Sequence, residues 1–407
     1  MTLVWLGASA APAQETLECL LAKTAWTTQQ ESGNLEAAAR SFAILARRCG
    51  GESRETLEQH AWHFVSKLKG PELRTARINA LQALYDGEFK YPNGNEPSDW
   101  WRELVQQKLA LKETEAAGKI LRRIEEPGVL LGMRVDKRFD DLLKAMPDKF
   151  DIAKAHERRI ARYQASVAIN PRSLAARNDL SRALRAAGRP REALATVESA
   201  LAAGELLFED WREQYPWVLT MRGYALLDVD EDAEGLKALA QADKVSRSGS
   251  DTASFVINLA LSQAQLGQPE AALTTINRVS NTSNFGALLA ANARHQAWVQ
   301  LAEHAKAEDV LREIAEQQSA APAVYLDALI RAGKTQAAKK LMLERLRDPD
   351  RRTGALIEVQ TYRNSATSGG PPEQPKLSRR QELFADPEVR ALILEVGRIE
   401  KFAFPEP

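Results

Sequence analysis

The sequence offers few side chains with the types and spacing of an active site. His60 and His63 lie one helical turn apart in EQHAWH and could share a metal ion, but no third ligand follows at metal-site spacing. The acidic run that begins at Asp228 lacks the central Gly and final Glu of a calcium loop. His295 and His304 straddle a predicted helix–turn boundary and are interpreted as structural. With no phosphate loop, nucleophile elbow or HExxH motif, we expect no catalytic residue, metal or cofactor.

The two cysteines are the next candidates for chemistry. Cys19 lies 14 residues before Gly33 and Cys49 lies 16 residues after it, and Gly33 occupies the turn between helices predicted at about 15–30 and 35–48. Equal arms bring both thiols to the open end of an antiparallel hairpin, so we expect Cα atoms about 4.4–6.8 Å apart and a disulfide. The alternative is a pair of free thiols. A disulfide would favour an oxidising compartment.

Residues 1–14, MTLVWLGASAAPAQ, are typical of the end of a secretory signal peptide, with a short apolar stretch before a small-x-small site. No basic residue precedes that stretch, and the alternative is an N-terminal packing helix. Together with the cysteines, this segment favours a periplasmic or secreted location, otherwise a cytoplasmic one. The sequence contains no run of 18 apolar residues, so we expect no transmembrane segment in the mature chain.

A recurring pattern organises the elements that position these residues. A Gly is followed by an Ala five positions later, an apolar residue four further on, and usually another three beyond that. The sets are Gly33, Ala38, Phe42 and Leu45; Gly188, Ala193, Val197 and Ala200; Gly267, Ala272, Ile276 and Val279; and Gly333, Ala338 and Met342. The last set departs from the pattern at Arg345. Spacings of four and three place the apolar residues on one helical face, and the Gly suits the end of the preceding helix.

This pattern resembles the tetratricopeptide repeat, a 34-residue helix–turn–helix unit. The resemblance is clear over 172–348 and loose over 50–170. It implies an all-α fold: an α-solenoid of antiparallel helix pairs that forms a right-handed superhelix, with an irregular N-terminal helical half. The domains expected are a signal peptide remnant (1–14), irregular hairpins (15–170), repeats (171–348), a Ser/Gly/Pro linker (349–383) and a C-terminal helix or cap (384–407).

In such solenoids the first helix of each unit lines a concave surface that takes peptides or protein segments. The resemblance implies that a set of polar and aromatic residues faces inward and binds the partner. These residues are Asn178, Arg182, Arg185, Trp217, Tyr224, Asn292, Gln296 and Arg331. We expect Arg182 and Arg185 to join Trp217 and Tyr224 in one aromatic–basic patch that takes an acidic, partly apolar segment. The alternative is that Trp217 packs between repeat units.

Charge and composition limit the function. Lys+Arg and Asp+Glu both number 55, so the net charge is zero, which disfavours nucleic acid as a partner. Residues 151–203 carry ten basic and five acidic side chains, and 204–235 carry two and nine, which could reflect complementary repeats or a groove with one basic wall. The function we expect is a non-catalytic scaffold for protein–protein interaction, placed in the bacterial envelope by analogy with other proteins of this kind alone. The alternative is an accessory subunit of an enzyme, or a cryptic metal-dependent enzyme, on a helical solenoid.

Overall fold

The computed structural model of the 407-residue chain describes residues 16–91, 94–246, 252–280, 282–363 and 373–407. These residues form helices and no sheet; their extended pairing is limited to the isolated bridges Asp136–Gly397 and Thr361–Lys401. The expected all-α fold is therefore confirmed for the described residues. The predicted signal peptide remnant, 1–14, lies outside them.

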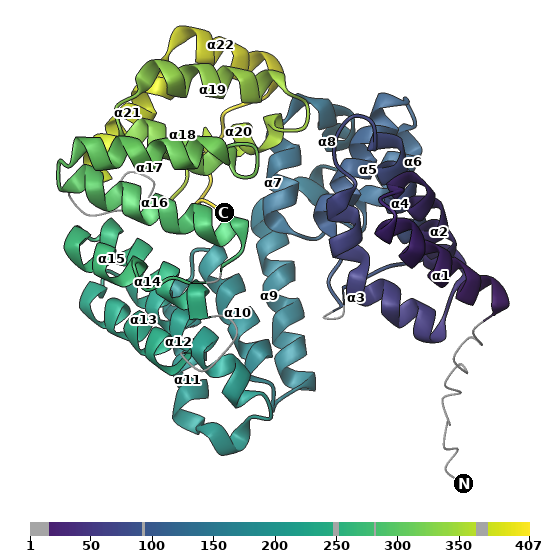
Figure 1. Cartoon of the computed structure of the whole chain (residues 1–407), viewed down its shortest axis with the longest axis horizontal. Coiled ribbons are helices and arrows are strands. Elements are labelled where there is room, and N and C mark those ends of the chain that lie inside the picture. Colours follow the sequence, from purple (N-terminus) through teal and green to yellow (C-terminus); the bar gives the residue numbers. More distant parts are fainter. Residues whose placement is uncertain (1–15, 92–93, 247–251, 281, 364–372) are drawn as a thin grey trace. The chain divides into compact units, whose positions relative to one another are not determined.

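The chain divides into two compact units (Figure 1). The first comprises Met1–Leu130 with Arg138–Lys149, and the second comprises Leu131–Lys137 with Phe150–Pro407. This division differs from the boundary expected at residue 170, because α9 packs against α10 and so belongs with the repeats. Helix α7 (Pro127–Val135) begins in the first unit and ends in the second.

The first unit is a set of helical hairpins closed by the disulfide. Its helices are α1 (Leu17–Glu31), α2 (Leu35–Arg48), α3 (Gly51–Lys67), α4 (Arg74–Asp86), α5 (Ser98–Ala110), α6 (Thr114–Leu121) and α8 (Asp140–Ala145). The rings of Trp26, Phe42 and Phe64 pack together at centroid distances of 4.8–5.6 Å. Cys19 and Cys49 form a disulfide with Cα atoms 5.6 Å apart, which confirms the pairing expected from the hairpin.

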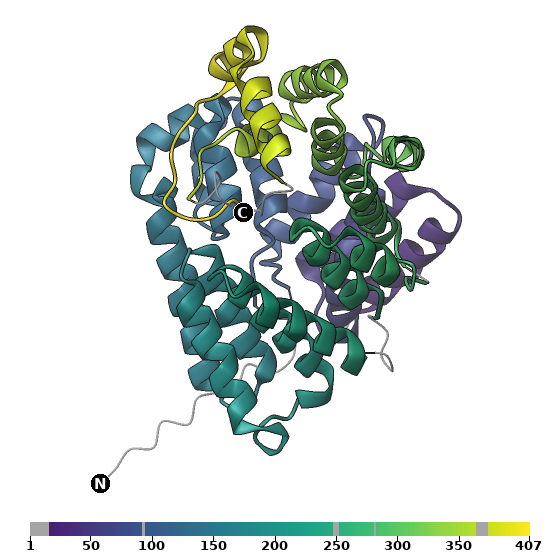
Figure 2. The same cartoon turned by 90° about the vertical axis from the view of Figure 1, so that its left-hand side faces the viewer.

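The second unit contains the repeated helix pairs. They are α10 (Leu174–Ala186) with α11 (Pro190–Ala203), α12 (Trp211–Leu227) with α13 (Asp232–Ser246), α14 (Thr252–Gln265) with α15 (Pro269–Ile276), α16 (Asn284–Gln300) with α17 (His304–Glu316), and α18 (Pro322–Arg331) with α19 (Thr335–Arg347). Helix α9 (Ile152–Ile169) packs against α10, and α9 to α13 lie side by side in Figures 1 and 2. The first helices of successive pairs also contact one another, and we call the surface they form the inner face.

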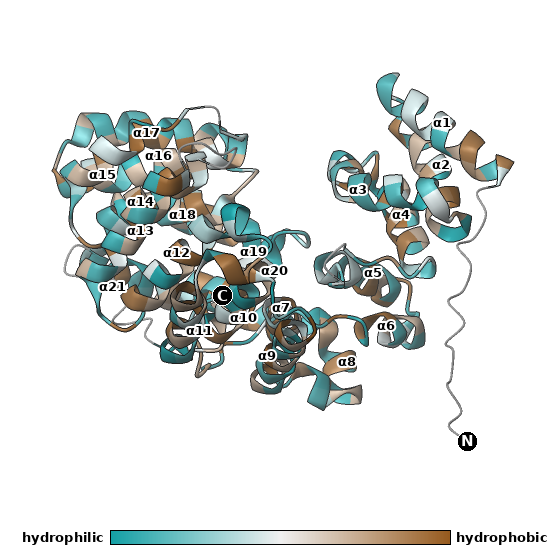
Figure 3. Cartoon of the chain, turned by 90° about the horizontal axis from the view of Figure 1, so that it is seen from below, coloured by the Kyte–Doolittle hydropathy of each residue, from teal (hydrophilic) through white to brown (hydrophobic). Residues whose placement is uncertain are grey.

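The repeat positions adopt the roles that the sequence pattern predicts. Gly188 ends α10 with a φ of 74°, a conformation that side chains with a Cβ rarely adopt. The other glycines of the pattern, Gly33, Gly267 and Gly333, have φ between 71° and 75°. Ala193 and Val197, which follow Gly188, are completely buried between helices. Individual helices carry both hydrophobic and hydrophilic residues (Figure 3), as expected for amphipathic helices that pack on one face.

The chain beyond the repeats does not form the uniform linker expected over 349–383. Helix α20 (Arg352–Glu358) follows α19, and α21 (Gln374–Ala385) begins within the range assigned to the linker. Helix α22 (Pro387–Val396) agrees with the expected C-terminal helix. The short α20 packs on α19, and α21 packs on α18, so both helices gain tertiary contacts that composition does not reveal. We call residues 373–407 the closing segment.

The closing segment also returns to the beginning of the second unit. The amide of Arg398 donates to the carbonyl of Val135 at 3.0 Å, and Arg134 pairs with Glu400 at 2.7 Å. Further along, the amide of Phe402 donates to the carbonyl of Thr361 at 2.8 Å. The contacts of Val135 and Arg134 join the two separate stretches of sequence that make up the second unit.

The contact between α12 and α13 depends on a glycine. A Cβ on Gly223 would lie 2.7 Å from Leu239 Cγ and 3.0 Å from the carbonyl oxygen of Gly235. We expect Gly223→Ala to lower the free energy of unfolding by about 1–3 kcal/mol, as overpacking does. Gly118→Ala is the control. Its Cβ would lie no closer than 3.8 Å to a neighbouring atom, Met146 Cε, and Ala has a higher helix propensity than Gly, so we expect no loss of stability. Urea denaturation measures both; equal stability of Gly223→Ala and wild type would contradict the prediction.

Candidate functional site

The structure brings Arg185 and Tyr224 together on neighbouring repeats. The Arg185 guanidinium lies 5.0 Å from the centroid of the Tyr224 ring, a cation–π distance. The same guanidinium forms an ion pair with Asp228, at the end of α12. Burial raises the pKa of the Tyr224 hydroxyl to about 12, against a smaller opposing effect of Arg185. The positive charge of Arg185 is thus already shared between a carboxylate and an aromatic face.

Trp217 lies in a different environment from Tyr224. Its ring packs against Phe255 of α14 with centroids 4.5 Å apart, in a cluster with Leu219 and Ala242. The side chain is only partly exposed. This packing favours the alternative interpretation, in which Trp217 stabilises the contact between α12 and α14, over a free aromatic anchor beside Tyr224.

Arg182 and Asn178 occupy the same helix, α10, in contrasting environments. Arg182 is exposed and its nearest carboxylate, on Asp179, is 3.8 Å away. Asn178 is buried, and its Oδ1 has no hydrogen-bond partner among the described residues. Arg182 is therefore the site residue on α10 with most freedom to meet a partner.

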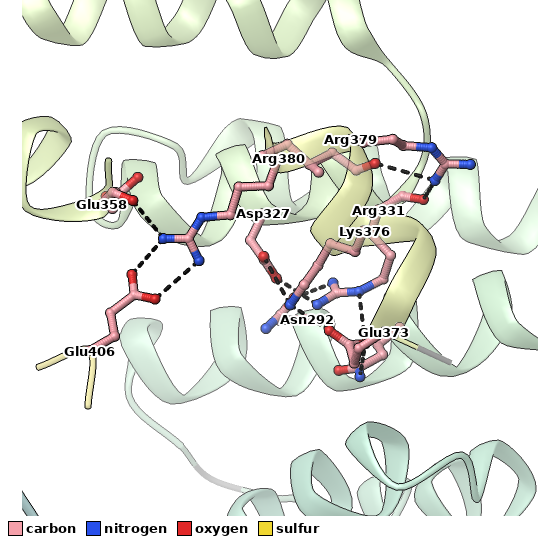
Figure 4. A network of polar contacts seen from close by, with 11 residues as sticks. Asn292, Asp327, Arg331, Glu358, Glu373, Lys376, Arg379, Arg380 and Glu406 are labelled. Atoms are coloured by element: carbon pink, nitrogen blue, oxygen red, sulfur yellow. Dashed lines mark hydrogen bonds and ion pairs between the residues drawn. The ribbon is translucent and has the colours of Figure 1, made fainter. Parts of the chain in front are cut away.

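The remaining predicted site residues form hydrogen bonds and ion pairs with other residues of the same chain. Gln296 of α16 donates to Glu373 Oε1 at 2.8 Å, and both side chains are buried. Arg331 of α18 donates to Asn292 Oδ1 at 3.2 Å and to Asp327 Oδ2 at 2.5 Å. Figure 4 shows Asn292, Asp327 and Arg331 beside Glu373 and Lys376 of the closing segment. Asn292, Gln296 and Arg331 thus belong to one polar cluster with Asp327 and Glu373.

Helix α21 continues these contacts along α18. Lys376 pairs with Asp327 at 3.3 Å and with Glu373 at 2.5 Å. Arg379 donates to the carbonyl of Arg331 at 2.8 Å, at the end of α18 (Figure 4). Burial raises the pKa of Asp327, but Arg331 and Lys376 outweigh burial and lower it to about 2. Charged side chains therefore bind the first turns of α21 to α18, and Leu383 further along α21 belongs to an apolar cluster with Leu326 and Ile330 of α18.

Sequence reasoning missed the residues of α21. Glu373 and Lys376 lie within the Ser/Gly/Pro-rich stretch NSATSGGPPEQPK, whose composition is typical of a linker. One signal in the sequence could have indicated this helix: charged residues recur at spacings of three, at Glu373, Lys376 and Arg379, which places them on one helical face.

Two buried histidines make the second unit sensitive to acid. Burial, together with the charge of Arg331, lowers the pKa of His295 to about 4; burial and Arg159 lower that of His156 to about 4. The unfolded chain, with histidine pKa values near 6.5, binds more protons between these limits. Stability should therefore fall as pH drops from about 6.5 to 4, by up to about 1.4 kcal/mol per pH unit for each histidine.

Urea denaturation at several pH values measures this dependence. His295→Gln should reduce the slope, whereas His304→Gln, at an exposed position on the neighbouring helix, should leave it unchanged. A slope equal in wild type and His295→Gln would show that His295 does not titrate as expected.

The described ranges contain no group of three or more His, Cys, Asp and Glu side chains placed to hold a metal ion. Within the same residues, no helix combines the length and apolar character needed to cross a bilayer. His60 and His63, the pair considered from sequence, both lie at exposed positions of α3.

No protein-family model matches the chain, and no curated protein matches its sequence. Among solved structures, the crystal structure of the APC/C hetero-tetramer Cut9–Hcn1 is similar, with a TM-score of 0.40, 13% identity, and coverage of 94% of this chain and 66% of that chain. The TPR domain of P58(IPK) has a TM-score of 0.21 and 10% identity, over 90% of this chain and 98% of that chain. The helix pairs and repeat positions described above define this chain as a helical-repeat protein with a tetratricopeptide-like fold.

Proposed function

We propose that the chain is a non-catalytic scaffold that binds polypeptide segments on the inner face of its second unit. The observation that carries this proposal is the contact between that face and α21. Gln296, Arg331 and Asp327 belong to the first helices of two repeats, and they hold the start of α21 through contacts with Glu373 and Lys376. Asn292 accepts a hydrogen bond from Arg331 and so supports this contact from within the repeats. An inner face that binds a helix from its own chain has the chemistry to bind one from another protein.

The partner we propose carries acidic and apolar side chains and meets the inner face at α10 and α12. Arg182 is exposed there, and Arg185 adds a second cation beside the ring of Tyr224. The C-terminal part of the face is filled by α21, so a partner must lie beside α21 or replace it. An acidic side chain could compete with Asp228 for Arg185, since that ion pair is partly exposed to water.

Selection of helical peptides against the full-length chain tests this function. We expect the selected peptides to be rich in Asp and Glu interspersed with apolar residues, and their affinity to fall about tenfold or more in an Arg182→Ala/Arg185→Ala variant. The matched control is Lys340→Ala, which removes an exposed cation from the second helix α19. Peptides that bind the double variant and wild type equally would contradict the proposed face.

We also propose that the protein works in the bacterial periplasm or outside the cell. The disulfide between Cys19 and Cys49 supports this location, because reducing compartments disfavour such bonds. Cell fractionation of the full chain, with a version lacking residues 1–14 as control, tests the location. Equal retention of both versions in the cytoplasm, with reduced cysteines, would refute it.

A further inference from the structure

A cavity of about 700 Å³ lies in the second unit where the first turn of α21 crosses α16 and the end of α18. The turns at Gly267 and Ala332 and the start of α17 complete its wall. The polar lining residues that matter below are His295, Gln300, Arg331, Lys334, Lys376 and Arg379. We call this cavity the α16–α21 pocket. Its volume is in the range of sites for small organic ligands.

Three of these lining side chains contain buried polar atoms without a hydrogen-bond partner among the described residues, although Nε of Arg331 lies 4.0 Å from Glu373 Oε1. These atoms are both ring nitrogens of His295, Oε1 of Gln300 and Nε of Arg331. His295 is fully buried, and Gln300 uses only its amide nitrogen, which donates to the carbonyl of Ala264 at 2.7 Å. Buried polar atoms are almost always hydrogen-bonded. The concentration of atoms without such a bond around one pocket therefore indicates that the pocket binds a polar ligand.

The charges around the pocket indicate the sign of that guest. Arg331 and Lys376 share the carboxylates of Asp327 and Glu373, and Lys334 pairs with Glu308 at 2.9 Å. Arg379 is the remaining cation of the lining. Its guanidinium donates to the carbonyls of Ile330 and Arg331 and pairs with no carboxylate among the described residues. The three carboxylates thus leave one positive charge uncompensated, which an anion would balance.

We propose that the α16–α21 pocket binds a small organic oxyanion, a carboxylate or a phosphate ester. Arg379 and Arg331 supply the charge that holds the oxyanion, and a ring N–H of His295 donates to it. Gln300 Oε1 accepts a hydrogen bond from a hydroxyl or amino group elsewhere on the ligand. This site goes beyond the proposed function, because it takes a small molecule and includes neither Arg182 nor Arg185. Since Lys376 and Arg379 belong to α21, the ligand also bridges α21 to the repeats.

Isothermal titration of the full-length chain tests the site. Inorganic phosphate and citrate are the two probes, glycerol is the uncharged comparison, and sodium chloride keeps the ionic strength constant. We expect saturable binding of at least one anion and none of glycerol. Tighter binding of citrate would assign carboxylates as the ligand class, and tighter binding of phosphate would assign phosphate esters.

Two variants and one spectroscopic measurement make the test specific. Arg379→Gln removes the uncompensated charge and should weaken anion binding about tenfold or more. Arg312→Gln removes an exposed cation of α17 outside the pocket and should leave binding unchanged. In nitrogen-15 spectra, the anion should shift the ring resonances of His295 but not those of His60, which lies at an exposed position of α3 outside the pocket.

Absence of saturable anion binding, or equal binding by Arg379→Gln and wild type, would overturn the proposal. A crystal structure with only water against His295 in the presence of both anions would also overturn it. Peptide binding that depends on Arg182 and Arg185 would be unaffected by these results, so this site and the proposed function can fail separately.

Discussion

Replacing Arg345 by Met should destabilise the second unit by about 3–5 kcal/mol, the cost of leaving one partner of a buried ion pair alone. Arg345 is 2% exposed, and its guanidinium donates to both carboxylate oxygens of Glu358, at 2.8 and 2.5 Å. The pair joins α19 to α20 beside an apolar cluster that includes Leu346 and Leu356. Without Arg345, the largely buried Glu358 carboxylate loses the guanidinium that binds both of its oxygens.

The double variant Arg345→Met/Glu358→Met provides the control. Because apolar side chains can replace a buried ion pair at little cost, the double variant should recover most of the lost stability. Urea denaturation of wild type, both single variants and the double variant gives the coupling energy directly. A double variant no more stable than Arg345→Met would show that the arginine acts through packing alone, independently of Glu358.

Reduction of the Cys19–Cys49 disulfide should destabilise the first unit by about 3–4 kcal/mol. The bond closes a sequence separation of 30 residues, and the chain-entropy relation for a loop of that length gives this magnitude. Hydrogen exchange with and without reductant measures the effect locally. We expect faster exchange in α1 and α2 and no change in α16 or α18, which belong to the other compact unit.

A Cys19→Ala/Cys49→Ala variant distinguishes the bond from a general effect of the reductant. Its exchange should be fast from the start and insensitive to reductant. If reductant accelerated exchange equally in the variant and in wild type, the disulfide would not be the cause.

The sequence predicts the repeats well because their determinants are local. A left-handed Gly at each turn and a buried Ala five residues later are properties of one hairpin, and they identify the hairpin at Gly33 as readily as that at Gly188. The same regularity makes Arg345 informative. It occupies an apolar position of the pattern, and the reason is its partner Glu358 on α20.

The environment of the candidate site is harder to predict because it depends on distant segments. The repeat pattern identifies Arg331 as inward-facing, but no local rule reveals that Glu373 and Lys376 lie against that face. Residues seven apart share a helical face, which is correct geometry for Trp217 and Tyr224. Periodicity does not specify that Phe255 covers one ring while Arg185 covers the other.

The contact between Arg134 and the closing segment limits the order in which the second unit can fold. Arg134 and Glu400 are 266 positions apart. A ribosome that adds about 5–20 residues per second therefore incorporates Glu400 on the order of tens of seconds after Arg134. During that interval the repeats can form, because their contacts are local, but the ends of the second unit stay apart. Synthesis of Glu400 therefore decides when this contact of the second unit can form. A protein that crosses a membrane as an unfolded chain would therefore have this interval for transport before the two ends of its second unit join.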